Sequence, residues 1–182
     1  KQHLELCRDI AQKFNNDFKL DNFFIAPEPL IQKEFSRIMS LKDGLKKMSK
    51  SELSDLSRIN LTDTKDEIVN KIKKAKTDSL PLPSTIDQLD NRPETKNLVG
   101  IYSSLSGLSF ENSINEFSGK NFSKFKDSLS QVLIDKITPI STEIRKLIDD
   151  KSYLDKILLE GSKKANEIAS KKMKKIHEIV GF

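Results

Sequence analysis

Apolar residues recur three and four positions apart over residues 1–14, which is the spacing of one face of an α-helix. Charged and polar residues occupy the positions between them, so this segment is predicted to form an amphipathic helix. His3 falls among the charged positions and is expected at the surface, whereas Cys7 is expected to be a small buried residue. The apolar stripe consists of Leu4, Cys7, Ala11 and Phe14, widened by Leu6 and Ile10.

The helical spacing stops at a polar loop, and two prolines, Pro27 and Pro29, exclude a helix in the segment that follows. Residues 37–41 (RIMSL) are then predicted to form a short strand, which ends at the turn formed by residues 42–44 (KDG). Residues 49–52 (SKSE) have the S-x-x-E pattern of a capping box, which predicts the start of a short helix.

A second clear helical pattern covers residues 64–76. Thr64 and Glu67 match a capping box at its start, and Ile68, Ile72 and Ala75 supply the stripe that it is expected to bury. Residues 80–97 contain three prolines and are predicted to be an extended connector. The other faces of the helix are expected to present its lysines to solvent: Lys71, Lys73, Lys74 and Lys76.

The rest of the chain has helical spacing throughout. A helix over residues 98–105 is expected to end at Gly107, and the next one is expected to be interrupted near Pro139. The last helix, from Tyr153 to Val180, is expected to have a break or a weak point at Gly161. The pattern predicts a mixed fold class, with an α/β part followed by an all-helical part. Three aromatic residues could stack on RNA bases, but their positions favour the core: Tyr102, Phe122 and Phe125.

Composition narrows the class of protein only moderately. The net charge of +5 and the isoelectric point near 9.1 favour a polyanionic partner, although lysines that serve solubility alone explain both equally well. The single cysteine fits a reducing cytoplasm, and no cluster of His and Cys indicates a zinc site. No apolar run approaches the roughly 18–20 residues needed to span a bilayer, so no membrane segment is expected.

The segment LKKMSKSELSD, residues 45–55, has two interpretations. As a capped helix start it would be purely structural. As a phosphate-binding loop it would use two ammonium groups, those of Lys47 and Lys50, together with backbone N–H groups and the hydroxyls of Ser49 and Ser51. Such a loop could stabilise the negative charge that develops on a pyrophosphate leaving group.

Residues 47–51 match the KMSKS signature of class I aminoacyl-tRNA synthetases at every position. The surrounding RIMSLKDGLKKMSKS, the later IKKAKTDS and the C-terminal YLDKILLEGSKKANEIA all resemble bacterial tryptophanyl-tRNA synthetases. The resemblance covers essentially the whole chain. An intact KMSKS favours tryptophan over tyrosine as the amino acid, because tyrosyl-type enzymes usually depart from it.

The resemblance implies a tryptophan–tRNA ligase, which activates tryptophan with ATP as an adenylate and transfers it to tRNA(Trp). Residues 1–59 would be the C-terminal part of a Rossmann-type catalytic domain, and residues 60–182 a helical tRNA-binding domain whose last helix packs back on the catalytic domain. Lys47 and Lys50 would be the catalytic residues and would hold the ATP phosphates. The other residues implied at the ATP site are Ile38, Met48, Ser49 and Ser51.

Mg²⁺ would enter with ATP, and the full-length enzyme would be a homodimer. The His-x-Gly-His-like signature and the tryptophan pocket are not found among these residues, so the chain is expected to be a C-terminal portion that is inactive alone. The alternative is a non-catalytic, basic, helical RNA-binding module that retains a relic KMSKS loop. In either case the lysines of residues 71–76 and 171–175 are candidate RNA-facing groups, or else ordinary solvated faces.

Overall fold

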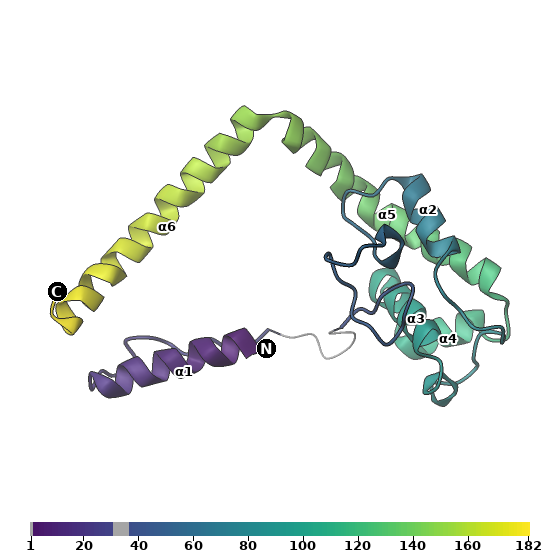
Figure 1. Cartoon of the computed structure of the whole chain (residues 1–182), viewed down its shortest axis with the longest axis horizontal. Coiled ribbons are helices and arrows are strands. Elements are labelled where there is room, and N and C mark those ends of the chain that lie inside the picture. The colour runs from purple at the N-terminus through teal and green to yellow at the C-terminus, as the bar shows by residue number, and fades with distance from the viewer. Residues whose placement is uncertain (1, 31–36) are drawn as a thin grey trace. The chain divides into compact units, whose positions relative to one another are not determined.

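The computed structural model describes residues 2–30 and 37–182, which form helices joined by loops (Figure 1). Two compact units divide the chain, one made of Lys1–Lys33 with Ser152–Phe182 and the other of Glu34–Lys151. None of the helices in the described residues combines the length and the apolar character needed to cross a bilayer. The helices are α1 (Gln2–Asp17), η1 (Asp55–Ser57), α2 (Lys65–Lys73), η2 (Asp87–Leu89), α3 (Pro93–Ser106), α4 (Phe110–Phe117), α5 (Phe122–Asp149) and α6 (Lys151–Val180), where η marks a 3₁₀ turn.

The β-structure of the described residues amounts to one isolated antiparallel bridge, between Met39 and Lys47. The strand predicted at residues 37–41 is therefore reduced to this bridge. The reason is that the N–H and C=O groups of Met39 bond to the side-chain amide of Asn97, both at 2.9 Å, in place of a neighbouring strand. The α/β part of the predicted fold class is thus not seen as a sheet in the described residues, which are mainly helical.

The helix predicted from the S-x-x-E pattern at residues 49–52 is also absent. The Ser49 hydroxyl accepts a hydrogen bond from the Ser51 N–H at 3.3 Å and lies 2.9 Å from the Ser51 hydroxyl, so it closes a tight local turn. A serine side chain can satisfy a nearby N–H in this way without any helix. The first helical residues after the loop are those of η1.

The capping box predicted for α2 is confirmed. The Thr64 hydroxyl accepts from the Glu67 N–H, and the Glu67 carboxylate accepts from the Thr64 N–H at 2.7 Å. The backbone hydrogen bond from Thr64 is the main reason that the pKa of Glu67 lies below its ordinary value. Ile68 and Ile72 are fully buried, as predicted. The prediction that the lysines of this helix face solvent is wrong for Lys71, which is only 2% exposed.

The core of the second unit lies where α2, α3, α4 and α5 meet (Figure 1). Phe125 is fully buried, and its ring meets that of Phe117 edge to face at 5.1 Å. Tyr102 is also buried, and burial raises the pKa of its phenol. Phe122 packs against the same core, so the prediction that these aromatic residues are core residues is confirmed.

Two helix breaks predicted from the sequence do not occur. Helix α5 continues through Pro139, and α6 continues through Gly161. Proline removes one backbone donor from a helix, but Ile137 and Ser141 on either side are buried, so tertiary packing keeps α5 helical on both sides of Pro139. The carbonyl of Thr138 accepts hydrogen bonds from the hydroxyls of Ser141 and Thr142. Glycine costs a helix only about 1 kcal/mol, which a long helix tolerates.

In the first unit, α1 forms as predicted but packs mainly through its C-terminal end. Phe14 contacts the rings of Phe18, Phe23 and Phe24 at 4.7–5.7 Å. Helix α6 joins this cluster through Lys172, whose ammonium lies 3.6 Å from the centre of the Phe23 ring and donates to the Phe23 carbonyl. Lys172 is therefore half-buried against aromatic rings, unlike the neighbouring Lys171.

The expectation for Cys7 is wrong, because its side chain is exposed. Ala11 is the buried residue of α1, whereas Leu6 and Ile10 are exposed like Cys7 and Leu4 is half-buried. An apolar stripe shows where a helix can pack and not what covers it. His3 is exposed, as expected.

Candidate functional site

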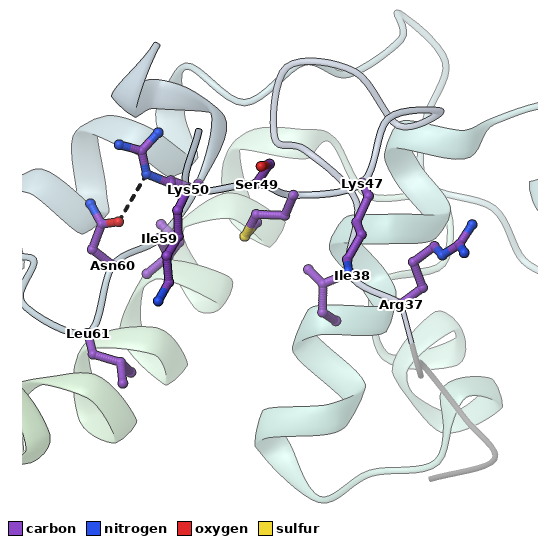
Figure 2. Close-up of a pocket in the computed structure, with 10 residues that line it drawn as sticks. Arg37, Ile38, Lys47, Ser49, Lys50, Ile59, Asn60 and Leu61 are labelled. Atoms are coloured by element: carbon purple, nitrogen blue, oxygen red, sulfur yellow. Dashed lines mark hydrogen bonds between the residues drawn. The ribbon is translucent and has the colours of Figure 1, made fainter. Parts of the chain in front are cut away.

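A pocket of about 490 Å³ opens where the loop around residues 47–50 faces two other segments of the second unit, residues 37–38 and 58–61. Figure 2 shows the side chains of Lys47 and Lys50 extending from the loop in the same direction. The pocket is lined by Arg37, Ile38, Lys47, Met48, Ser49, Lys50, Arg58, Ile59, Asn60 and Leu61.

The charge of this lining selects for anions. Four of its side chains are cationic, those of Arg37, Lys47, Lys50 and Arg58, and none of the lining residues is Asp or Glu. Apolar groups of Ile38, Met48, Ile59 and Leu61 lie among these charges. A concave site with one sign of charge concentrates ligands of the opposite sign, and its apolar part can cover a ring or an aliphatic group. The pocket is therefore suited to a ligand with an anionic end and an apolar end.

The N-terminal arm of the loop, defined as residues 38–48, is held by backbone hydrogen bonds. The Met48 N–H donates to the Ile38 carbonyl at 3.0 Å, and the Ser40 N–H donates to the Lys46 carbonyl at 2.8 Å. The Asn97 amide of α3, which can donate and accept at once, holds Met39 from the other side. These bonds keep Ile38 beside Lys47 and Met48.

The same arm rests closely on the start of α3. A Cβ atom added to Gly44 would lie 2.5 Å from the backbone of Pro93 and Glu94, which is too close for any side chain. The Leu41 carbonyl accepts from the Lys76 N–H at 2.8 Å, and Leu41 itself is only 1% exposed. The turn at residues 42–44 is thus fixed by helix α3 and by the end of α2.

The C-terminal arm, defined as residues 49–54, is held differently. Inside the arm, Ser49 and Ser51 bond to each other, and the Glu52 N–H makes a long 3.5 Å contact with the Ser49 carbonyl. From outside the arm, the Arg58 guanidinium donates to the carbonyls of Glu52 at 2.9 Å and Ser54 at 3.5 Å. Side-chain groups therefore replace the backbone pairing of the other arm, and Lys50 lies in this less constrained part.

Five of the six site residues predicted from the sequence lie together in the pocket lining, and their roles stay a prediction. Ser51 is outside the lining and contacts the site through Ser49. One flank of the pocket, residues 58–61, was not predicted from the sequence, and neither was Arg37. No spacing rule marks these residues, and the one available signal was their nearness in sequence to the KMSKS segment.

The described residues show no cluster of side chains that could bind a metal ion. Residues 2–30 and 37–182 contain no group of three or more His, Cys, Asp or Glu residues that could hold a metal ion. The pocket presents ammonium, guanidinium, hydroxyl and amide groups, which suit phosphate oxygens rather than a bare cation.

Comparison with known proteins gives a consistent answer. The family model described as tRNA synthetases class I (W and Y) matches residues 1–138. The tryptophan–tRNA ligase of Caulobacter vibrioides is 49% identical over 182 residues, which cover all of this chain and 53% of that protein. The tryptophan–tRNA ligase of Rickettsia conorii is 50% identical, with all of this chain and 54% of that protein covered. The chain thus spans about half the length of the curated relatives it matches.

Solved structures agree with these relatives. The tryptophanyl-tRNA synthetase of Mycoplasma pneumoniae has a TM-score of 0.82 and 27% identity, covering all of this chain and 53% of that one. That of Campylobacter jejuni, complexed with ADP and tryptophan, has a TM-score of 0.67 and 27% identity, covering all of this chain and 54% of that one. The resemblance first seen around residues 47–51 is confirmed, and the chain belongs to the class I tRNA synthetases for tryptophan and tyrosine.

Proposed function

We propose that the full-length protein containing this chain is a tryptophan–tRNA ligase. It would join the carboxylate of tryptophan to the α-phosphate of ATP, release pyrophosphate, and transfer the aminoacyl group to tRNA(Trp). Relatives with that name match the chain over its whole length at 47–50% identity. The observation that carries the proposal is the pocket in which the KMSKS lysines and Ile38 meet.

Lys47 and Lys50 are the catalytic residues of this proposal. Their ammonium groups would bind the phosphates of ATP and stabilise the charge that grows on the leaving pyrophosphate. Ile38 and Met48 supply apolar surface for the adenosine part, and both line the pocket. Ser49 and Ser51 set the shape of the C-terminal arm through their mutual hydrogen bond.

Mg²⁺ would reach the site bound to ATP, because the lining has cationic side chains and neutral hydrogen-bonding groups but no carboxylate. When bound, it would supply a Lewis acid that neutralises phosphate charge. The Campylobacter jejuni synthetase was solved with ADP and tryptophan, which supports a nucleotide and this amino acid as ligands here too. The tryptophan pocket would lie outside the present chain, and the functional enzyme would be a homodimer.

The proposed domain division places residues 1–59 with a Rossmann-type nucleotide-binding domain and residues 60–182 with a helical domain that binds tRNA(Trp). The contact of Lys172 with Phe23 within the first unit supports the part of this division in which the last helix packs back on the earlier segment. Exposed lysines such as Lys171, Lys174 and Lys175 are candidates for contacts with RNA phosphates or else lie on an ordinary solvated face, whereas the burial of Lys71 removes it from the candidates.

The proposal is tested by replacing Lys50 with alanine in the full-length protein. Tryptophan-dependent exchange of pyrophosphate with ATP should fall roughly 10²–10³-fold, the effect of losing one donor to transition-state charge. Tryptophan binding should barely change. Lys46→Ala is the matched control, because Lys46 is exposed in the same loop and outside the pocket lining. Exchange near the wild-type rate in Lys50→Ala would contradict the assignment.

A further inference from the structure

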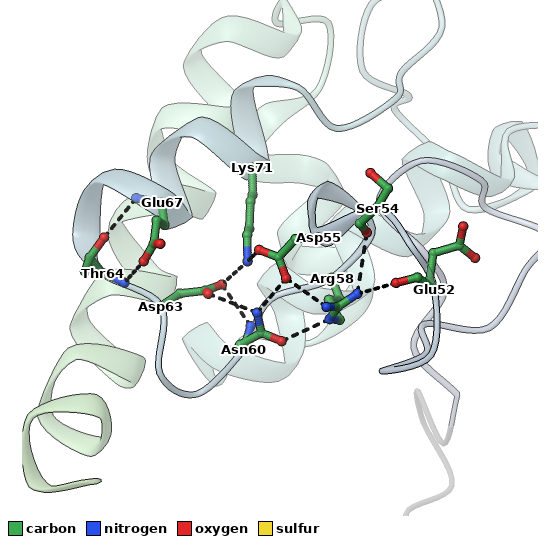
Figure 3. A network of polar contacts seen from close by, with 9 residues as sticks. All are labelled: Glu52, Ser54, Asp55, Arg58, Asn60, Asp63, Thr64, Glu67 and Lys71. Atoms are coloured by element: carbon green, nitrogen blue, oxygen red, sulfur yellow. Dashed lines mark hydrogen bonds and ion pairs between the residues drawn. The ribbon is translucent and has the colours of Figure 1, made fainter. Parts of the chain in front are cut away.

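Lys71 of α2 is a buried, charged residue that has no role in the proposed chemistry. Its side chain is 3% exposed, and its ammonium lies 2.6 Å from a carboxylate oxygen of Asp55 and 2.6 Å from one of Asp63 (Figure 3). Asp63 is itself buried, with 5% of its side chain exposed. A buried ammonium is costly unless it is paired, so these contacts make its burial tolerable.

The two carboxylates continue the network away from α2. The second oxygen of Asp55 forms an ion pair with Arg58 at 2.9 Å and accepts a hydrogen bond from the Asn60 amide at 3.0 Å. Asn60 also donates to Asp63 through its backbone N–H at 2.9 Å and its side chain at 3.1 Å. The hydrogen bond from Lys71, followed by that from Asn60, holds the pKa of Asp55 below its usual value, so Asp55 stays ionised at neutral pH.

The network ends on the C-terminal arm of the KMSKS loop. Arg58 uses one nitrogen for Asp55 and another for the carbonyls of Glu52 and Ser54, which lie two and four residues beyond Lys50. Figure 3 shows this continuous path of contacts from Lys71 through Asp55 and Arg58 to Glu52. Lys71, Asp55 and Asp63 are not among the residues that line the pocket.

We propose that Lys71 is a positioning residue: through Asp55 and Arg58 it fixes the C-terminal arm, so that Lys50 is presented to the pocket. The proposal rests on the function proposed above. Buried ion networks add little net stability compared with apolar packing, and what they do provide is directional contacts. The planar guanidinium of Arg58 makes several such contacts at fixed angles, which suits it to hold a backbone segment.

The decisive variant is Lys71→Met in the full-length protein, since Met keeps much of the side-chain volume and removes the charge. The turnover number for ATP–pyrophosphate exchange should fall on the order of 10-fold, because small displacements of a catalytic group are costly. The KM for tryptophan should not change. Lys73→Met is the matched control, because Lys73 lies on the same helix and is exposed.

A double-mutant cycle separates positioning from a general structural role. If Lys71 acts through Lys50, then Lys71→Met should cause little further loss in a Lys50→Ala background. The same loss in both backgrounds, or a folded Lys71→Met protein with wild-type turnover, would overturn the proposal. Restoration of turnover by Lys71→Arg, which keeps a cation at this position, would support it.

Two further measurements keep the proposal falsifiable if Lys71→Met does not fold, or if the wild type does not exchange pyrophosphate. Asp55→Asn alters a side chain that is 54% exposed, so it should fold and still lower turnover, unlike the control Asp127→Asn on α5. Amide hydrogen exchange at residues 49–54 should become faster in Lys71→Met, or in Asp55→Asn if the former is unfolded, but not in Lys73→Met. If amide hydrogen exchange at residues 49–54 does not change in these variants, the anchoring of this arm by Lys71 is refuted. If the wild-type protein does not exchange pyrophosphate with ATP, only the proposed function is refuted.

Discussion

The two arms of the KMSKS loop are adjacent in sequence but are held by different kinds of interaction. The N-terminal arm pairs its own backbone groups, as in the bond from Met48 to Ile38, and is clamped by the neutral amide of Asn97. The C-terminal arm is held by the charged Arg58, which depends in turn on Asp55 and Lys71. Neutral groups thus provide most of the contacts of one arm, whereas the end of the other arm is held in part by an ionic network.

A phosphate-binding loop needs a part that keeps its position and a part that can respond to the ligand, and the two arms differ in this way. Backbone pairing fixes Lys47 beside Ile38 whatever the pH or salt concentration, because neutral amides do not titrate and are not screened. The arm with Lys50 is held in part by charged side chains, whose contacts depend on pH, on salt and on the charge that enters the pocket. We therefore expect the N-terminal arm to be a fixed part of the site and the C-terminal arm to respond to its ligand.

The largest effect on stability is expected from Asn97→Ala, which removes the clamp on the N-terminal arm. Both backbone groups of the half-buried Met39 would lose their partner, and a polar group left unpaired inside a protein costs up to about 1–3 kcal/mol. The free energy of unfolding, measured with urea, should fall by roughly 2–4 kcal/mol. Asn115→Ala, an exposed change on α4, should stay within about 0.5 kcal/mol of the wild type. An equal response of the two variants would show that the clamp contributes nothing.

A smaller loss is expected from Gly44→Ala, which pushes the same arm away from α3. The new methyl group would meet backbone atoms at 2.5 Å, and overpacking of this kind costs about 1–3 kcal/mol. Gly161→Ala is the opposite case, because it adds a methyl group to a helix with no atom within 4 Å. That change should raise the melting temperature, since alanine favours a helix over glycine by about 1 kcal/mol. Melting curves that shift in the same direction for both would contradict the close approach of Gly44.

The smallest effect is expected from pH, and it should fall on the C-terminal arm. The pKa of Asp55 is lower in the folded chain than in the unfolded one, chiefly because Lys71 donates to it. Its contribution to stability is therefore present above the ordinary carboxyl pKa of about 4 and is lost as the pH falls through the lowered value. Urea midpoints measured from pH 7 down to pH 3 should decline less in Asp55→Asn than in the wild type. A decline of the same size in both would mean that Asp55 is not part of the pH response.

The lysines of α2 show where prediction from sequence succeeds and where it fails. The helix itself was predictable, because its capping box joins residues three positions apart and its apolar stripe repeats every three or four. Lys71 and Lys73 look alike in such a pattern, yet one is buried and the other is exposed. The difference comes from Asp55 and Asp63, which approach from a loop whose path no periodicity describes.

The pocket divides in the same way. Lys47, Lys50 and Ile38 were predicted from a short signature and its resemblance to a family, because the signature is contiguous and its chemistry follows from residue type. Residues 58–61, on the other flank, line the pocket because the chain folds back beside the loop, and no sequence pattern marks this contact. The local clustering of charge was visible in the sequence, but the cavity was not.

The sequence by itself determined what depends on neighbours within about four positions: helices α1, α2, α5 and α6, the Thr64 cap, and the KMSKS signature. Tertiary structure decided what depends on distant partners. Asn97 lies 58 positions from Met39, and its amide turned a predicted strand into a single bridge. Packing on both sides likewise carried α5 through Pro139 against the local preference of proline. The physical reason is that local hydrogen bonds and spacing follow from the order of residues, whereas burial and pairing depend on which segments fold against each other.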